Sequence, residues 1–167
     1  MGPTLDITPA HVAETRDWVY ERDGRVVRLI NRVRSELGDV FDADVASVTR
    51  DEYRDEVMVV FADGDRAANV AAMVTILREL EVPDDHPGFI VDEIVGRELA
   101  GTIAGEQPLR LLAEATFHYA DATHHPEMPG EIAGIDDLDA ALAAGFQTRL
   151  PGWPWTERHG PFDDLPD

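Results

Sequence analysis

The sequence predicts an α+β protein that is mainly α, with helices packed on a small antiparallel β-hairpin. Two observations lead to this class. Apolar residues recur at the three- and four-residue spacing of helices through most of the chain. One segment, Glu56–Ala62, is instead a continuous run of β-branched, aromatic and other apolar residues, as in a buried strand. An all-α bundle is the alternative fold.

The first part of the chain predicts a long helix over residues 9–37. Thr8-Pro9 provides an N-cap and a proline at the first helical position, and Gly38 stands where helices commonly end. Asp23-Gly24 complicates this interpretation, since it also suits a turn between two helices or the tip of a hairpin. The apolar positions step by fours and sevens, which favours helix.

The predicted hairpin pairs Ala43–Arg50 with Glu56–Ala62. The first segment alternates weakly between apolar and polar residues, and an acidic, turn-like stretch separates the two. A helix that begins after Thr49 is the rival interpretation, because Thr49 and Glu52 match a capping box. A two-stranded hairpin is marginally stable in water, so we expect helices or a second subunit to cover it.

Four further helices are predicted in the rest of the chain. The first is capped by Asp65 and stopped by Pro83, and the others span residues 89–104, 108–123 and 136–144. Gly145 is expected to end the last of them. We therefore expect a single globular domain over residues 1–150, followed by a Pro/Trp-rich C-terminal arm over residues 151–167.

The charge balance is the strongest compositional signal. Acidic residues number 34 against 14 basic ones, all of them arginine, for a formal net charge of −20. Such a surface repels itself in dilute buffer, but molar salt shortens the Debye length to about 3 Å and screens most of this repulsion. The composition resembles that of cytoplasmic proteins from extremely salt-loving archaea, and it predicts a halophilic, intracellular protein.

Composition also argues against several function classes. The chain has no cysteine, which excludes disulfides and thiolate chemistry, and no apolar run long enough to span a bilayer. Its N-terminus lacks the features of a secretory signal. Nucleic-acid binding needs clustered cations, and the best cluster is short: Arg25, Arg28, Arg32 and Arg34. Mimicry of DNA remains a lesser alternative, because the acids are spread along the whole chain.

A histidine-rich stretch, Phe117–Gly130, is the candidate for metal binding. Imidazole and carboxylate groups at helical spacing suit a divalent ion such as Zn²⁺, Mn²⁺ or Fe²⁺. The candidate ligands are Glu114, His118, Asp121, His124, His125 and Glu127, with His86 as a possible loop ligand. A water molecule on such a metal would be a nucleophile.

Three features weaken the metal site. The apolar residues of the same helix, such as Leu109 and Leu112, lie opposite the histidine and carboxylate face, so that face is expected to meet solvent. Pro126 disfavours a helical conformation at His125. The spacing also matches none of the standard zinc patterns. The alternative is a polar helix end, where histidine is favourable beside the last carbonyl groups.

The C-terminal arm predicts a partner-binding segment. Aromatic side chains are typical anchors of interfaces, and proline reduces the entropy that an extended arm loses on docking. The residues concerned are Trp153, Trp155, His159 and Phe162. No catalytic signature stands out, since neither of the two serines lies in a nucleophile elbow. We therefore expect a non-catalytic protein that binds itself or another protein, with a metal-dependent enzyme or metal-binding module as the alternative.

Overall fold

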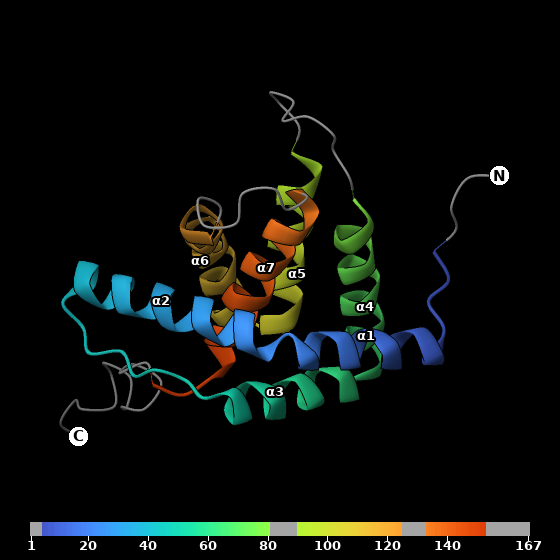
Figure 1. Cartoon of the computed structure of the whole chain (residues 1–167), viewed down its shortest axis with the longest axis horizontal. Coiled ribbons are helices and arrows are strands. Elements are labelled where there is room, and N and C mark those ends of the chain that lie inside the picture. The colour runs from blue at the N-terminus through green and yellow to red at the C-terminus, as the bar shows by residue number, and fades with distance from the viewer. Residues whose placement is uncertain (1–4, 81–89, 125–132, 153–167) are drawn as a thin grey trace, which may run out of the picture.

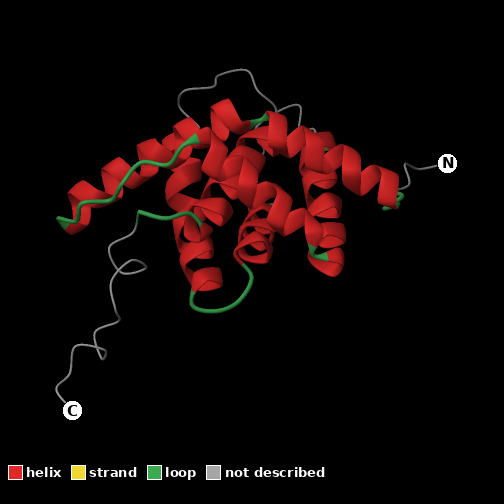
Figure 2. Ribbon diagram, turned by 90° about the horizontal axis from the view of Figure 1, so that it is seen from below, coloured by secondary structure: helices red, strands yellow, loops and turns green. Residues whose placement is uncertain are grey.

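The regular structure in the described part of the chain is entirely helical (Figures 1 and 2). A computed structural model describes residues 5–80, 90–124 and 133–152. Within these ranges there are seven helices and no strand: α1 (Pro9–Glu21), α2 (Asp23–Phe41), α3 (Arg50–Ala62), α4 (Gly64–Glu79), α5 (Val91–Ala104), α6 (Leu109–His124) and α7 (Ala133–Arg149). The predicted α+β class is therefore wrong, and the all-α bundle fits.

The helices form two groups that cross one another. In Figure 1, α1 and α2 follow each other along the long axis, with α3 beside them, while α4, α5, α6 and α7 stand across this axis. α7 packs against α2, α4, α5 and α6, so it is the centre of the bundle. Because α5 and α7 run opposite to α6, the start of α5, the end of α6 and the start of α7 lie at one end of the molecule.

The predicted hairpin is replaced by helix α3. Thr49 and Glu52 form the complete capping box, with the Glu52 amide donating to Thr49 Oγ1 at 3.1 Å and the Thr49 amide donating to Glu52 Oε1 at 2.9 Å. The β-branched run then places Tyr53, Val57 and Val60 on one buried face. A satisfied cap and a helical spacing of buried residues outweigh the local strand preference of valine.

The predicted single helix over residues 9–37 is wrong, because this segment forms two helices, α1 and α2, which is one of the alternatives that Asp23-Gly24 left open. The Thr8 side chain caps α1, accepting a hydrogen bond from the His11 amide at 3.1 Å, and the chain leaves helical geometry at Arg22. Gly38 does not end α2, which continues to Phe41 and stops at left-handed Asp42. Gly38 is instead a point of close approach, because a Cβ there would lie 2.8 Å from the carbonyl oxygen of Ala43.

The other predicted helices are present with shifted ends. α5 and α6 match the expected segments over their described residues, whereas Pro83 lies outside the described ranges. Asp65 does not cap α4, since the helix begins at Gly64 with Asp63 at the N-cap. The expected stop at Gly145 is also wrong, because α7 runs to Arg149.

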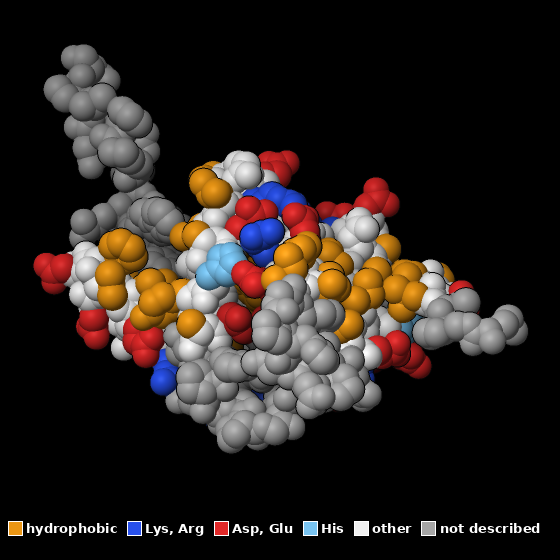
Figure 3. Space-filling model, turned by 90° about the horizontal axis from the view of Figure 1, so that it is seen from above, with side chains coloured by type: hydrophobic (Ala, Val, Ile, Leu, Met, Phe, Trp, Pro, Cys, Tyr) orange, Lys and Arg blue, Asp and Glu red, His pale blue; other side chains and the backbone are white. Residues whose placement is uncertain are grey.

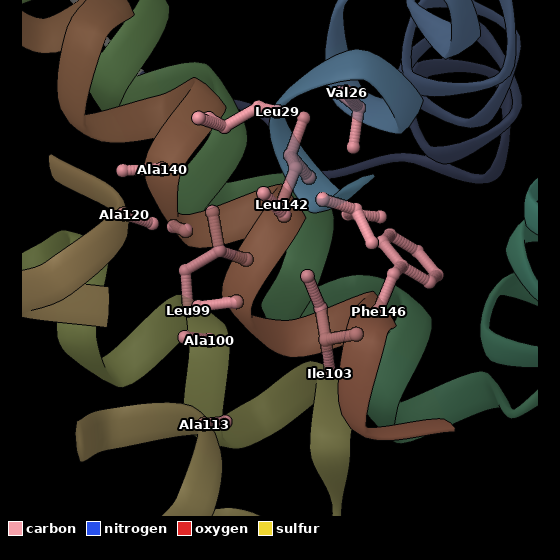
Figure 4. Close-up of a cluster of buried hydrophobic side chains, with 14 of the residues drawn as sticks. Val26, Leu29, Leu99, Ala100, Ile103, Ala113, Ala120, Ala140, Leu142 and Phe146 are labelled. Atoms are coloured by element: carbon pink, nitrogen blue, oxygen red, sulfur yellow. The ribbon is translucent and has the colours of Figure 1, made fainter. Parts of the chain in front are cut away.

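Helix α7 is buried on all sides through its middle. Every residue from Asp137 to Thr148 is buried, and Figure 4 shows α7 between side chains of α2, α5 and α6. Its alanines and Gly145 allow the neighbouring backbones to approach, since a Cβ at Gly145 would lie 2.8 Å from Cβ of Ile103. The glycine at position 145 is therefore required for close packing against α5 inside the helix, and it does not end α7.

One buried arginine ties α2 to the end of α7. The Arg34 guanidinium, 1% exposed, donates to four main-chain carbonyl oxygens at 2.6–3.0 Å, those of Ala46, Gln147, Leu150 and Pro151. The Ala46 amide also donates to the carbonyl oxygen of Gly152 at 3.1 Å. These bonds satisfy the last carbonyl groups of α7. They also hold residues 150–152, the last ones described, against the linker that follows α2.

Candidate functional site

An arginine-lined pocket lies where α1 meets α2. It has a volume of about 370 Å³, and its lining residues are Trp18, Glu21, Arg22, Asp23, Gly24, Arg25, Arg28 and Arg50. The break between the two helices at Arg22 and the start of α3 at Arg50 bring these residues together. Four of the fourteen arginines of the chain therefore surround one small cavity.

Arg22 and Trp18 form the rigid side of the pocket. Arg22 Nη2 donates to Asp139 Oδ2 of α7 at 2.8 Å, and the Asp139 carboxylate is 1% exposed. The Arg22 guanidinium also lies 4.8 Å from the centre of the Trp18 ring, and Arg78 of α4 lies 4.3 Å from the same ring. Trp18 is thus held by two cations, and Arg22 is fixed by a buried anion.

Asp23 and Gly24 form the floor at the first turn of α2. The Asp23 carboxylate is buried, with Oδ2 lying 2.6 Å from Arg54 Nη2 and 3.6 Å from Arg50 Nε. The Arg54 contact is an ion pair without hydrogen-bond alignment, because Asp23 Oδ2 has no hydrogen-bond partner. Gly24 has no side chain to displace Arg50, whose Nη2 atom occupies the place that a Cβ would need.

The arginine cluster noted in the sequence separates into three environments. Arg25 and Arg28, three residues apart on α2, line the pocket. Arg32 Nε lies 3.6 Å from Glu36 Oε1 on the same helix, and Arg34 is buried against carbonyl groups. Sequence reasoning missed the contributions of Trp18 from α1, Arg22 from the break between α1 and α2, and Arg50 from α3. The sequence signal was Asp23-Gly24, where the helix breaks.

The predicted metal ligands do not form one cluster in the described residues. Glu114 Oε1 pairs with Arg110 Nε at 3.4 Å, and His118 Nδ1 lies 3.2 Å from Glu93 Oε1 of α5. Both groups remain at the surface, as the sequence predicted for this face of the helix. The side chain of His124 and the residues His86, His125 and Glu127 lie outside the described part of the structure.

Asp121 joins a group of carboxylates that the sequence did not connect with it. Asp92 at the start of α5 and Asp137 at the start of α7 are buried, and both Asp92 and Asp121 form hydrogen bonds with Asp137. Burial above all, followed by these neighbouring carboxylates, raises the pKa of Asp137 to about 10. Asp137 therefore holds a proton at neutral pH, and the three acids form a proton-sharing cluster, here called the carboxylate cluster.

Figure 3 looks onto this end of the bundle and shows a histidine beside acidic side chains, with hydrophobic side chains around them. In residues 5–80, 90–124 and 133–152, no group of three or more histidine, aspartate or glutamate side chains is placed to hold a metal ion. The carboxylate cluster shares a proton instead.

No helix in those ranges is both long and apolar enough to cross a membrane.

The predicted partner-binding residues of the arm, Trp153, Trp155, His159 and Phe162, lie outside the described residues. The structure does place the start of the arm, at Gly152, beside the linker that follows α2.

Comparison with known proteins places the chain in a family. Residues 5–165 match the family described as Domain of unknown function (DUF7984). The chain belongs to this family. The match covers all seven described helices and extends into the C-terminal arm. No curated protein and no solved structure matches the chain.

Proposed function

We propose that this DUF7984 protein works without catalysis, through contacts between copies of itself in a salt-rich cytoplasm. The observation that carries the proposal is at the C-terminal end of α2. Val40 is 68% exposed and Phe41 is 71% exposed, although both are large apolar residues. They are adjacent in sequence, and burying each would contribute roughly 1.5–3 kcal/mol.

The position of these residues suits an interface. In Figure 1, the end of α2 projects beyond the helices that pack on its other half. Asp39 and Asp42 flank the apolar pair, so an apolar centre is bordered by charge, as in many protein interfaces. Single exposed apolar residues are ordinary on a protein surface, but two neighbours exposed to this extent at a helix end form a surface that a partner can cover.

The C-terminal arm is the segment that we assign to cover this surface on a second copy. The arm starts at the linker after α2, because the Gly152 carbonyl accepts a hydrogen bond from the Ala46 amide. Fifteen residues follow Gly152, among them Trp153, Trp155 and Phe162. Exchange of arms between two copies would place aromatic anchors on each exposed α2 end and give a closed, two-fold assembly.

The net charge supports the proposed salt-rich environment. At −20, two copies repel each other strongly in dilute buffer, so association requires screening. We expect both the fold and the assembly to be more stable at 3 M KCl than at 0.1 M KCl, where the Debye length is about 10 Å. Thermal unfolding at the two salt concentrations checks this, and a Tm that does not rise with salt would contradict it.

Light scattering coupled to size-exclusion chromatography in molar KCl tests the assembly. The full chain should elute as a dimer or larger oligomer. Phe41→Ser and removal of residues 153–167 should each shift it toward the monomer. Leu111→Ser is the matched control, because Leu111 is a similarly exposed apolar residue, at 63%, on another helix, α6. It should leave the mass unchanged. A strictly monomeric full chain would overturn the proposed function.

A further inference from the structure

In the lining of the pocket at the α1–α2 junction, arginines outnumber carboxylates, whereas in the whole chain acidic residues outnumber arginines. Acidic residues outnumber arginines by more than two to one in the sequence. The pocket lining contains four arginines, Arg22, Arg25, Arg28 and Arg50, but only two carboxylates, Glu21 and Asp23. A cavity that merely followed the composition would have the opposite sign. This concentration of cations needs a physical reason.

Nearby acids pair with some of these arginines. Asp23 is shared between Arg50 and Arg54, and Arg54 is the closer of the two. Asp139 neutralises Arg22 from outside the pocket lining. Arg28 and Arg50 remain exposed at the pocket mouth. Elsewhere the pattern differs, since Arg149 Nε lies 2.8 Å from Glu56 and Arg110 Nη2 lies 2.8 Å from Glu98.

Local backbone geometry brings a guanidinium against the start of α2. The pocket floor includes Asp23 and Gly24 in the first turn of this helix, where the Gly24 amide donates to Asp23 Oδ1 at 2.9 Å. Gly24 lets the Arg50 guanidinium lie directly against this turn. Guanidinium groups and a helix start therefore face the same small volume, and a guanidinium does not lose its proton at any ordinary pH.

We propose that this pocket binds the phosphoryl group of a small molecule. Arg28 and Arg50 are exposed side chains of the pocket lining, and a phosphate monoester carries a charge of about −2 at pH 7. The planar guanidinium donates paired hydrogen bonds to phosphate oxygens. A volume of about 370 Å³ suits a small ligand. The Trp18 ring already makes cation–π contacts with Arg22 and Arg78. We therefore expect the ligand to be bound through its charge and not by stacking of a nucleotide base on Trp18.

Isothermal titration calorimetry of the full chain tests the site, at one KCl concentration at which circular dichroism shows it folded. The probes are inorganic phosphate and glycerol 3-phosphate, with citrate as a carboxylate comparator. We expect each chain to bind one molecule of phosphate or of glycerol 3-phosphate. If inorganic phosphate binds more tightly, the ligand is free phosphate, and if glycerol 3-phosphate binds more tightly, the ligand is a phosphate ester. Arg28→Gln and Arg50→Gln should each weaken binding about tenfold or more, the typical effect of losing a charge-assisted hydrogen bond.

Two further variants separate a specific site from general electrostatics. Gly24→Ala changes no charge, but its Cβ displaces the end of the Arg50 side chain, so it should also weaken phosphate binding. Arg32→Gln removes the same charge from the next turn of α2, outside the pocket lining, and should change affinity less than about twofold. Binding that is absent in the full chain, or weakened equally by Arg32→Gln and Arg28→Gln, would overturn the assignment, as would tighter binding of citrate.

Discussion

The arginine pocket and the carboxylate cluster are two places where this protein brings like charges together, and they resolve the repulsion differently. In the pocket, four arginines meet two carboxylates beside the first turn of α2. In the carboxylate cluster, Asp92, Asp121 and Asp137 meet with no arginine among them, and a proton on Asp137 relieves the repulsion. Both sites join helices that are distant in sequence.

The difference follows from the chemistry of the two groups. A carboxylate becomes neutral by taking a proton, and burial makes this favourable. A guanidinium has no such option, because it keeps its proton at any ordinary pH. An arginine removed from water therefore needs an anion or a set of carbonyl groups. Arg22 has Asp139 and Arg34 has four carbonyl oxygens, whereas Arg28 and Arg50 of the pocket remain exposed to water.

The largest expected effect comes from removing the anion of a buried arginine. Asp139→Asn leaves the Arg22 guanidinium, 15% exposed, without its carboxylate, and should lower the free energy of unfolding by about 3 kcal/mol. Asp17→Asn is the control, because the Arg16–Asp17 pair is exposed and such pairs contribute less than about 1 kcal/mol. Chemical denaturation in molar KCl measures both, and equal effects would contradict the comparison.

A pH-dependent effect of similar size is expected in the carboxylate cluster. The pKa of Asp137 is about 10 in the folded protein and near 3.9 in an unfolded chain. The folded state therefore binds a proton that unfolding releases, and this contribution to stability decreases as pH rises from about 4 to 10. Asp137→Asn, whose amide donates hydrogen bonds at any pH, should remove the decrease.

Between pH 6 and pH 9, the variant should gain about 1–4 kcal/mol relative to the original chain. Denaturation curves at both pH values measure the gain. Glu114→Gln is the matched control, since Glu114 lies on α6 beside Arg110 at the surface, and it should leave the pH dependence unchanged. An unchanged slope in Asp137→Asn would show that the cluster does not hold the proton.

The smallest expected effect concerns metal. Because a proton joins Asp92, Asp121 and Asp137, and because His118 pairs with Glu93, we expect elemental analysis of untagged protein to find less than about 0.2 divalent metal per chain. His118→Ala should not change this value. One metal per chain, lost in His118→Ala, would instead support the metal-binding alternative that the sequence suggested.

Local sequence signals predicted those features that depend on a few neighbouring residues. Thr8-Pro9 was read correctly as a helix start, and the capping box at Thr49 gave the right rival interpretation for α3. The strand prediction failed because valine prefers strands only when a neighbouring strand is present. Gly38 and Gly145 were predicted as helix ends, but both lie inside helices. Gly38 leaves room for the Ala43 carbonyl group in the turn that follows α2, and Gly145 packs against Ile103 of α5.

The candidate sites were less predictable. Asp121 was noted for its helical spacing from His118, but its actual neighbours, Asp92 and Asp137, are 29 and 16 residues away in sequence. Likewise, Arg25 and Arg28 were noted as a short cluster, while Arg22, Arg50 and Trp18 complete the pocket. A single sequence contains no signal for which distant side chains converge.

The sequence by itself determined the acidic surface, the helix starts that its caps specify and the apolar faces at helical spacing. These depend on composition and on interactions within a few residues. Only the tertiary structure decided that α7 is buried on all sides, that one group of arginines faces a cavity and that three aspartates share a proton. The reason is that charge and burial depend on distance in space, which the packing of α1, α2 and α3 across α4–α7 sets.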